Sequence, residues 1–211
     1  MDRRSRDPER TRARLLDAAK ELFARHGLHG VSVAEIAKRA KVSVGMINHH
    51  FGGKDELYRA CLDEFADLRL RSLDRFLAPP TSREELLVRL RLLIDDLLDL
   101  HLAHPEVVAI LLRDVNAAEM WGPALERKLY EFTPRLARFF AQAQKLGMLR
   151  DDVEPLVVAS IIYMSLSALL QADSHRARVS GTSLRDAKTR TRFIAQLLDV
   201  VLHGALPGRP A

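Results

Sequence analysis

Apolar residues recur at intervals of three and four along most of the chain, which is the spacing of one face of an α-helix. The clearest run follows the Ser82-Arg83-Glu84-Glu85 capping box, and its leucines repeat at 4-3-4-3 spacing: Leu86, Leu90, Leu93, Leu97 and Leu100. We find no convincing strand pattern and no internal repeat in the sequence. The chain is therefore predicted to be all-α, with about nine helices.

The first quarter of the sequence predicts one longer helix and two short ones. Asp7 before Pro8 is typical of a helix start and Gly27 of a helix end, so the first helix is expected from about residue 8 to 26. The capping box at 32–35 opens a second helix. Ser43 is expected to cap a third helix, in which Val44 and Ile47 face inward and which Gly52-Gly53 ends.

The remaining residues predict longer helices. One runs from Lys54 to the Pro79-Pro80 pair, and others are expected at about 83–104, 105–120, 122–146, 155–173 and 187–201. Pro134 is expected to kink the helix at 122–146, and residues 172–183 are expected to form a polar loop. We expect two domains, 1–56 and 57–211.

The net charge of +5 is concentrated at one end of the chain. Residues 1–60 hold 13 Lys and Arg against 8 Asp and Glu, whereas the remaining 151 residues hold 20 of each kind. This asymmetry favours a basic module that binds nucleic acid or another anionic surface. The alternative is a basic surface that is merely solvated.

Three features of the sequence bear on the cellular compartment of the protein. Cys61 is the only cysteine, which excludes an intramolecular disulfide and fits the reducing cytoplasm. No apolar signal peptide opens the chain. The 18 residues at 155–172 carry no charge, but their serines favour a helix buried in a bundle or between subunits over a membrane span.

The two short helices around a tight turn suggest a helix-turn-helix. Gly45 costs the second of them about 1 kcal/mol relative to alanine, and the missing side chain lets that helix approach a groove or phosphate closely. The alternative is a three-helix core with an ordinary polar face. The face left outward is polar and consists of Ser43, Gly45, Met46, Asn48, His49 and His50.

Residues 11–62 resemble the DNA-binding domain of the tetracycline-repressor (TetR) family of bacterial regulators. The matching pattern comprises Ala18-Ala19, Leu22-Phe23, Gly27, Val33, Ile36-Ala37, Ala40, Val42-Ser43, Gly45, His50-Phe51, Lys54 and Leu57. The resemblance implies an N-terminal three-helix DNA-binding domain followed by a helical ligand-binding and dimerisation bundle. It also implies a repressor that is released from DNA by a small ligand.

The resemblance further implies which residues contact DNA. The helix that begins near Ser43 enters the major groove, Gly45 allows close docking, and Lys54 clamps a phosphate. Basic residues before the first helix reach the minor groove. The full predicted set is Arg3, Arg4, Arg6, Ser32, Lys41, Ser43, Val44, Gly45, Met46, Asn48, His49, His50 and Lys54.

Two positions depart from the family pattern. Lys41 stands where the family usually has glycine, so it either accepts a left-handed backbone at about 1 kcal/mol or avoids that conformation, and it can add a phosphate contact. Asn48 stands where the family often has tyrosine, so it can form a hydrogen bond but lacks the aromatic ring.

A near-palindromic duplex requires two reading helices about 34 Å apart, so a homodimer is predicted. The uncharged helix and the last helix are expected to form its interface, through Ala159, Ile162, Leu166, Leu169, Ile194, Leu198 and Val201. An unknown small-molecule effector is expected in an apolar cavity, although the same side chains are also typical of a core: Met120, Trp121, Tyr130, Phe139, Phe140, Tyr163 and Met164.

Other functions find weaker support. The sequence FGGKD fails as a phosphate-binding loop, because Asn48 and Asp55 stand where glycine and Ser or Thr are needed, so no enzyme is predicted. Cys61 lies on an apolar helix face and is interpreted as a core residue rather than a redox sensor. His101 and His104 are one helical turn apart, but no further cluster of metal-ligating residues is evident in the sequence, so neither a metal nor a cofactor is predicted. The alternative function is a helical adaptor whose basic end binds acidic partners.

Overall fold

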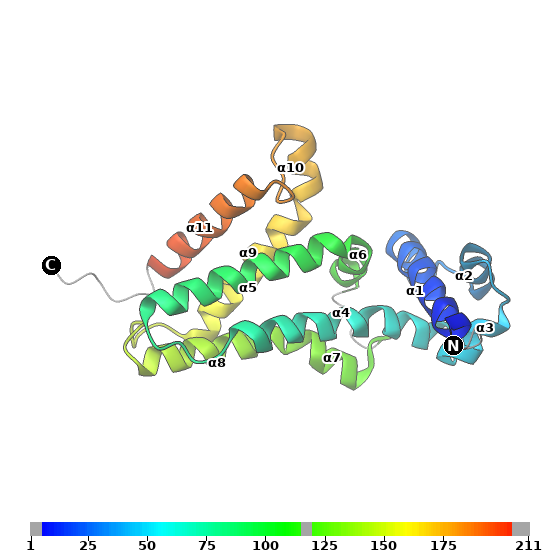
Figure 1. Ribbon diagram of the computed structural model, residues 1–211, viewed down its shortest axis with the longest axis horizontal. Helices are drawn as coiled ribbons and strands as arrows, with labels where there is room; N and C mark the ends of the chain where they lie inside the picture. The colour runs from blue at the N-terminus through cyan, green and yellow to red at the C-terminus, as the bar shows by residue number, and fades with distance from the viewer. Residues whose placement is uncertain (1–5, 115–119, 204–211) are drawn as a thin grey trace. The chain divides into compact units, whose positions relative to one another are not determined.

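The computed structural model describes residues 6–114 and 120–203, and the regular elements in these ranges are α-helices (Figure 1). The predicted all-α fold is therefore confirmed. The chain divides into two compact units, one formed by residues 1–67 and 104–128 and the other by 68–103 and 129–211. The expected domain boundary at 56/57 falls inside the first unit, because α6 and α7 belong with the N-terminal helices.

The first unit is built on a long helix and two short ones. It contains α1 (Arg6–His26), α2 (Val33–Ala40), α3 (Gly45–Phe51), the beginning of α4 (Lys54–Phe76), α6 (Pro105–Arg113) and most of α7 (Gly122–Tyr130). Phe23 and Tyr58, both fully buried, meet edge to face with their centroids 5.3 Å apart. Ile36 and Ile47 are also fully buried, so each short helix contributes one large side chain to this core.

A polar junction ties α6 to α1 inside this unit. Arg113 donates to the main-chain oxygens of Phe23 at 2.8 Å and Ala24 at 3.1 Å, in the last turn of α1. A cation stabilises that end of a helix, where the carbonyls have no partner within the helix. The Tyr58 hydroxyl donates to Asp114 at 2.6 Å, and burial together with this carboxylate raises the pKa of Tyr58 far above its ordinary value.

The second unit is a bundle. It contains the rest of α4, α5 (Arg83–Ala103), α8 (Phe132–Lys145), α9 (Pro155–Gln171), α10 (Asp173–Ser180) and α11 (Ala187–His203). Four leucines of the α5 seam, Leu86, Leu90, Leu93 and Leu97, are buried in a core shared with α8, α9 and α11, as the 4-3-4-3 spacing predicts, whereas Leu100 is half-buried. Arg190 on α11 forms ion pairs with Asp95 and Asp99 on α5, at the edge of that contact.

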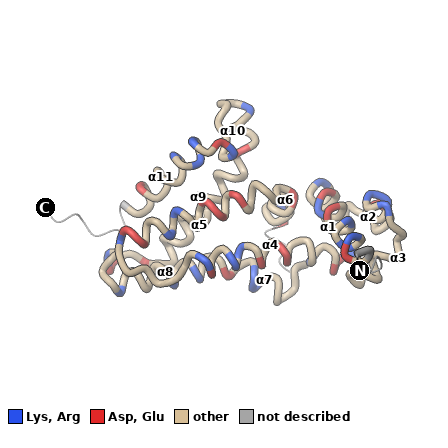
Figure 2. Tube along the Cα trace, viewed as in Figure 1, with Lys and Arg blue, Asp and Glu red and all other residues tan. Residues whose placement is uncertain are grey.

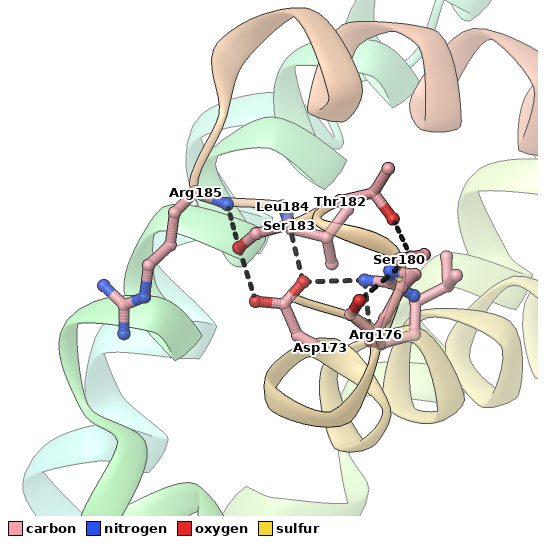
Figure 3. Close-up of polar contacts among 8 residues, drawn as sticks. Asp173, Arg176, Ser180, Thr182, Ser183, Leu184 and Arg185 are labelled. Atoms are coloured by element: carbon pink, nitrogen blue, oxygen red, sulfur yellow. Dashed lines mark hydrogen bonds and ion pairs between the residues drawn. The ribbon is translucent and has the colours of Figure 1, made fainter. Parts of the chain in front are cut away.

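A buried carboxylate joins α10 to the segment that leads into α11 (Figure 3). Asp173 is 7% exposed and accepts hydrogen bonds from Arg176 at 2.7 Å, the Ser183 hydroxyl at 2.9 Å and the Leu184 main-chain N–H at 2.7 Å. Because the carboxylate satisfies donors from a helix and from the chain that follows it, it fixes the turn between them.

The helix pattern differs from the prediction in three places, at one of which the helix expected to reach about residue 120 ends at Arg113. Residues 122–146 form two helices that part at Glu131, and Pro134 lies in the first turn of α8, where its missing N–H costs no helical hydrogen bond. Residues 173–180, predicted as loop, form α10. That helix has no apolar stripe of its own, so the periodicity of its sequence gave no signal.

The uncharged segment is α9, and Val158, Ala159, Ile162 and Leu166 on it are buried in the core of the second unit. Among the described residues, no single helix has both the length and the apolar character needed to cross a membrane. Only α9 and α10 taken together meet the length and composition criteria, and they are bent by 53° at their junction.

Candidate nucleic-acid interface

The second helix of the first unit begins as the sequence predicts. The Ser32 hydroxyl accepts a hydrogen bond from the Glu35 main-chain N–H at 3.2 Å, and Ser32 N–H donates to the Glu35 carboxylate at 2.8 Å. These reciprocal bonds form the predicted capping box. Hydrogen bonds from the hydroxyl and the main-chain N–H of Ser32 lower the pKa of Glu35. Ser32 is exposed, so its side chain lies at the surface where helix α2 starts.

The turn between α2 and α3 contains the strained residue of this region. Lys41 has φ 56° and ψ 48°, and it is the only residue other than glycine with positive φ in the described chain. Of the two alternatives considered for Lys41, the backbone adopts the left-handed one, which costs about 1 kcal/mol or more for a residue with a Cβ atom. Its side chain is exposed and free to approach an anion.

A basic residue of α1 holds this turn. The Arg14 guanidinium donates to the main-chain oxygens of Ala40 and Lys41 at the end of α2. Sequence reasoning missed this role, because Arg14 is one of several arginines in its segment and its partners lie 26 and 27 residues away. Arg12 lies over the Phe51 ring at 5.2 Å and so connects α1 to α3.

The third helix presents an open surface at its first turn. A Cβ atom built on Gly45 would meet nothing within 4 Å, so packing inside the protein does not explain this glycine. Ile47 is buried and seals α3 onto the core, as expected. Val44, which was expected to face inward, is 45% exposed, because it precedes the helix as its N-cap residue instead of lying within it.

Ser43 does not cap α3, contrary to the prediction. The N-cap residue is Val44 and no side chain bonds to the free N–H groups there, although Met46 N–H donates to the Ser43 main-chain oxygen at 3.1 Å. The Ser43 side chain is exposed instead. The start of α3 therefore leaves N–H groups available to an external acceptor such as a phosphate.

The last turn of α3 holds the predicted polar residues in different settings. Asn48 and His49 are exposed, and Met46 is half-buried. The His50 ring is half-buried beside the rings of His49 and Phe51, and its Nε2 atom is enclosed with no hydrogen-bond partner among the described residues. Asn48 and His49 are thus the more accessible of these polar side chains.

Lys54 has a structural role that the sequence did not reveal. Its ammonium group donates to the main-chain oxygens of Leu28 and Val31, each at 3.0 Å, and so braces the segment between α1 and α2. These two bonds use two of its three N–H groups. A phosphate contact through the remaining N–H group stays a prediction.

Lysine and arginine residues occur along α1 and α2, whereas α3 carries no Lys or Arg (Figure 2). The start of α3 therefore offers polar side chains and main-chain N–H groups, and the positive charge comes from residues on the neighbouring helices. Arg3 and Arg4 of the predicted set lie outside the described residues. Arg6 begins α1, and its side chain also lies outside the described part of the structure.

The seven predicted effector-binding residues do not share one environment. Met120 and Trp121 belong to the first unit and the other five to the second. Phe139 and Phe140 are buried in the core of the second unit, whereas Tyr130 and Met164 are 52% and 65% exposed. Tyr163 lies between these extremes, half-buried against Phe132.

The seven predicted interface residues point mostly into their own chain. Ala159, Ile162, Leu166, Ile194 and Leu198 are buried, and only Leu169 and Val201 are partly accessible. Five of the seven positions thus face the core of their own subunit, because 4-3-4-3 spacing marks the stripe that faces that core. The outward residues of α9 and α11 include Val157, Ile161, Met164, Ala168 and Val200.

Cys61 is fully buried and therefore belongs to the core, as interpreted from the sequence. Burial raises the pKa of its thiol to about 12, which leaves it protonated and unreactive at neutral pH. His104 packs edge to face on Phe65, and His101 Nδ1 lies 2.6 Å from the Leu97 main-chain oxygen. No cluster of three or more His, Cys, Asp or Glu suited to a metal ion occurs among residues 6–114 and 120–203.

Comparisons with known proteins identify the family of this helix-turn-helix. Residues 15–61 match the family of bacterial regulatory proteins described as the tetR family. The repressor SCO4008 of Streptomyces coelicolor, an HTH-type transcriptional repressor, is 30% identical over 181 residues, which cover 84% of this chain and 88% of that protein.

Solved structures resemble the whole chain in fold. The ketosteroid transcriptional regulator KstR2 of Mycobacterium tuberculosis has a TM-score of 0.72 at 20% identity and covers 93% of this chain and 95% of its own. A γ-butyrolactone receptor has a TM-score of 0.70 at 22% identity, with 95% and 90% covered. The matched length and the match over α1 to α4 together show that the chain belongs to the TetR family, as a helix-turn-helix transcriptional repressor and not an enzyme.

Proposed function

We propose that this repressor binds a near-palindromic operator as a homodimer and releases it when a small apolar or amphipathic effector binds the second unit. The protein acts in the cytoplasm in this proposal. Residues 1–56 read the DNA, and residues 57–211 hold the effector and the dimer interface. The single observation that carries the DNA-binding part is the open space around Gly45 at the exposed start of α3.

Packing among the described residues does not explain the glycine at position 45. Glycine loses more conformational freedom on folding than any other residue, and a protein keeps that cost where something requires it. No neighbour in the described chain approaches the position that a Cβ atom would occupy. A close approach by a partner from outside therefore explains the glycine, and a groove of DNA is the partner that the family implies.

The homodimer is supported by an apolar surface on the second unit. This α9–α11 surface consists of Val157, Ile161, Met164, Ala168, Leu197 and Val200. An open hollow of about 460 Å³ lies between the two helices, and Ala168, Leu197 and Val200 are among its lining residues, so both helices contribute to one surface. A second copy that buries this surface would remove its large exposed side chains from water.

The effector is proposed on physical grounds and by analogy. A ligand can change DNA affinity only if it favours one of two dimer geometries, one that aligns the two α3 helices and one that does not. The γ-butyrolactone receptor, which shares the fold, is named for a small ligand. An effector of comparable size is therefore a reasonable expectation for the second unit.

The decisive test is a footprint on the DNA upstream of the gene that encodes the protein and of the genes beside it. Protection of one near-palindromic site, with weak competition from random duplex, supports the proposal. The adaptor alternative predicts uniform binding to any polyanion, which falls steeply with salt. Sedimentation of the same sample gives the number of subunits on the site, and a monomer there would overturn the homodimer.

A further inference from the structure

A charged side chain lies in the core of the second unit. Arg69 on α4 is 5% exposed, and its guanidinium lies 5.3 Å from the ring centroid of Phe132 and 5.5 Å from that of Tyr163. These rings come from α8 and α9, and their centroids are 5.1 Å apart. A positive charge is thus enclosed against two aromatic faces from different helices.

One edge of this guanidinium lacks a partner. Both Nε and Nη2 of Arg69 are shut off from solvent, and neither donates a hydrogen bond to any described residue. The Nε–H bond and one Nη2–H bond lie side by side on the same edge of the planar group. Two parallel N–H bonds of this kind bind both oxygens of one carboxylate.

Neighbouring groups do not supply the hydrogen-bond acceptors that this edge of Arg69 lacks. The aromatic rings attract the face of the guanidinium but accept no hydrogen bond from its edge. The Asp96 carboxylate on α5 accepts hydrogen bonds from Ser72 and Arg75, and Arg69 forms no ion pair with it or with any other described carboxylate. Buried N–H groups are paired in nearly all native structures, and an unpaired buried charge is strongly unfavourable. The edge therefore lacks the acceptor that a buried guanidinium requires.

We propose that Arg69 binds the carboxylate of an organic acid whose apolar part lies beside Phe132 and Tyr163. The inference deepens the proposed function, on which it rests, because it assigns a chemical class to the effector. One buried guanidinium neutralises one negative charge, which favours a carboxylate over a phosphate monoester with its charge of about −1.5 to −2 at neutral pH. The aromatic rings favour an acid with an aliphatic or aromatic body over a small polar one.

The test measures binding to the full-length protein without DNA. Octanoate and benzoate are the probes, and octanamide and benzamide are neutral compounds of matching shape. Millimolar octanoate or benzoate is expected to raise the melting temperature of the wild-type protein, because a ligand that binds only the folded state stabilises it. The amides are expected to leave it unchanged. Calorimetry gives the stoichiometry, which should be one acid per subunit.

Three variants give this test its specificity. Arg69→Met is expected to abolish the response to the acids while its own melting temperature equals or exceeds that of the wild type, since an unpaired buried charge has been removed. Arg69→Lys keeps the charge but loses the paired N–H geometry, so affinity should fall by roughly tenfold. Arg71→Met, which removes an exposed arginine from the same helix, should respond as the wild type does.

The inference is overturned if acids and amides act alike, if Arg69→Met still responds to the acids, or if neither acid shifts the wild type. Should Arg69→Met not fold, an undiminished affinity of Arg69→Lys would overturn it equally. Because no DNA is present, these outcomes are independent of the footprint. A protein that binds the acids but protects no operator would refute the proposed function and leave the acid site standing.

Discussion

Arg14 of α1 donates a hydrogen bond of 2.9 Å to the main-chain oxygen of Lys41, the residue that adopts the left-handed conformation in the helix-turn-helix. The bond joins the first helix to the turn between the other two. The strained turn is thus held from outside by a charge-assisted bond, which offsets part of its cost. This arrangement allows a lysine to occupy a position where glycine is usual.

Lys41→Gly is expected to raise the free energy of unfolding by about 0.5 kcal/mol, because the relief of the left-handed strain slightly exceeds the entropy that glycine loses on folding. Urea denaturation measures this difference. Lys41→Ala is the matched control, since it removes the same charge and keeps the strain. A Lys41→Gly protein less stable than Lys41→Ala would contradict the account. If Lys41 also contacts a phosphate, both variants lose about one unit of salt slope in DNA binding.

Gly45→Leu is expected to leave the melting temperature nearly unchanged and to weaken operator binding by roughly tenfold or more. The Cβ atom enters open space in the protein alone but collides with a groove that approaches closely. Ala109→Leu provides the control, because it adds the same bulk to an exposed site on α6 outside the predicted DNA-contacting set. Equal DNA affinity for both variants would refute close docking at Gly45.

Lys54→Met is expected to lower the free energy of unfolding by about 1.5–3 kcal/mol, because two buried carbonyls lose bonds from a charged donor. Chemical denaturation at neutral pH measures the change. Lys38→Met, at an exposed position on α2, should change stability by less than about 0.5 kcal/mol. An unchanged stability of Lys54→Met would show that the bonds to Leu28 and Val31 contribute little.

Ile161→Lys is expected to convert the proposed dimer to a monomer, because it places a charge in the centre of the α9–α11 surface. Analytical ultracentrifugation over a range of concentrations measures the mass. Leu92→Lys is the matched control on α5, since Leu92 is 48% exposed and Ile161 46%. If Ile161→Lys dimerises with the same dissociation constant as the wild type, the interface lies elsewhere.

The lowered pKa of Asp173 predicts that the free energy of unfolding falls in acid. Burial alone would raise its pKa, but hydrogen bonds from Leu184 N–H, the Ser183 hydroxyl and Arg176 outweigh burial and lower the pKa below its ordinary value. The contribution of the ionised carboxylate to the free energy of unfolding is therefore complete above the unfolded-state pKa near 4. It is lost as the pH falls through the lower folded-state pKa.

The comparison of the wild type with Asp173→Asn measures this contribution. The difference in free energy of unfolding should be constant from neutral pH down to about pH 5 and should shrink below the ordinary pKa of about 4. Urea denaturation at a series of pH values follows it. A difference that does not change between neutral and acid solution would mean that the charge of Asp173 does not stabilise the α10–α11 connection.

The sequence by itself determined the elements that depend on local signals. Capping residues, glycine stops and helical spacing located α2 and the leucine seam of α5 and gave the all-α class. The pattern over residues 11–62 identified the helix-turn-helix and its family, because the core positions and the open Gly45 follow one another at fixed spacing. These features depend on neighbours a few residues apart, which periodicity and capping rules describe.

Only the tertiary structure decided which faces of the helices are covered. Five of the seven residues predicted for the dimer interface are buried in the core of the second unit, since an apolar stripe does not show whether its own chain or another copy covers it. The bonds of Arg14, Lys54 and Arg113, and the unpaired edge of Arg69, join residues 23 to 90 positions apart or depend on burial among several helices. Such contacts leave no local pattern, because they arise when distant segments pack together.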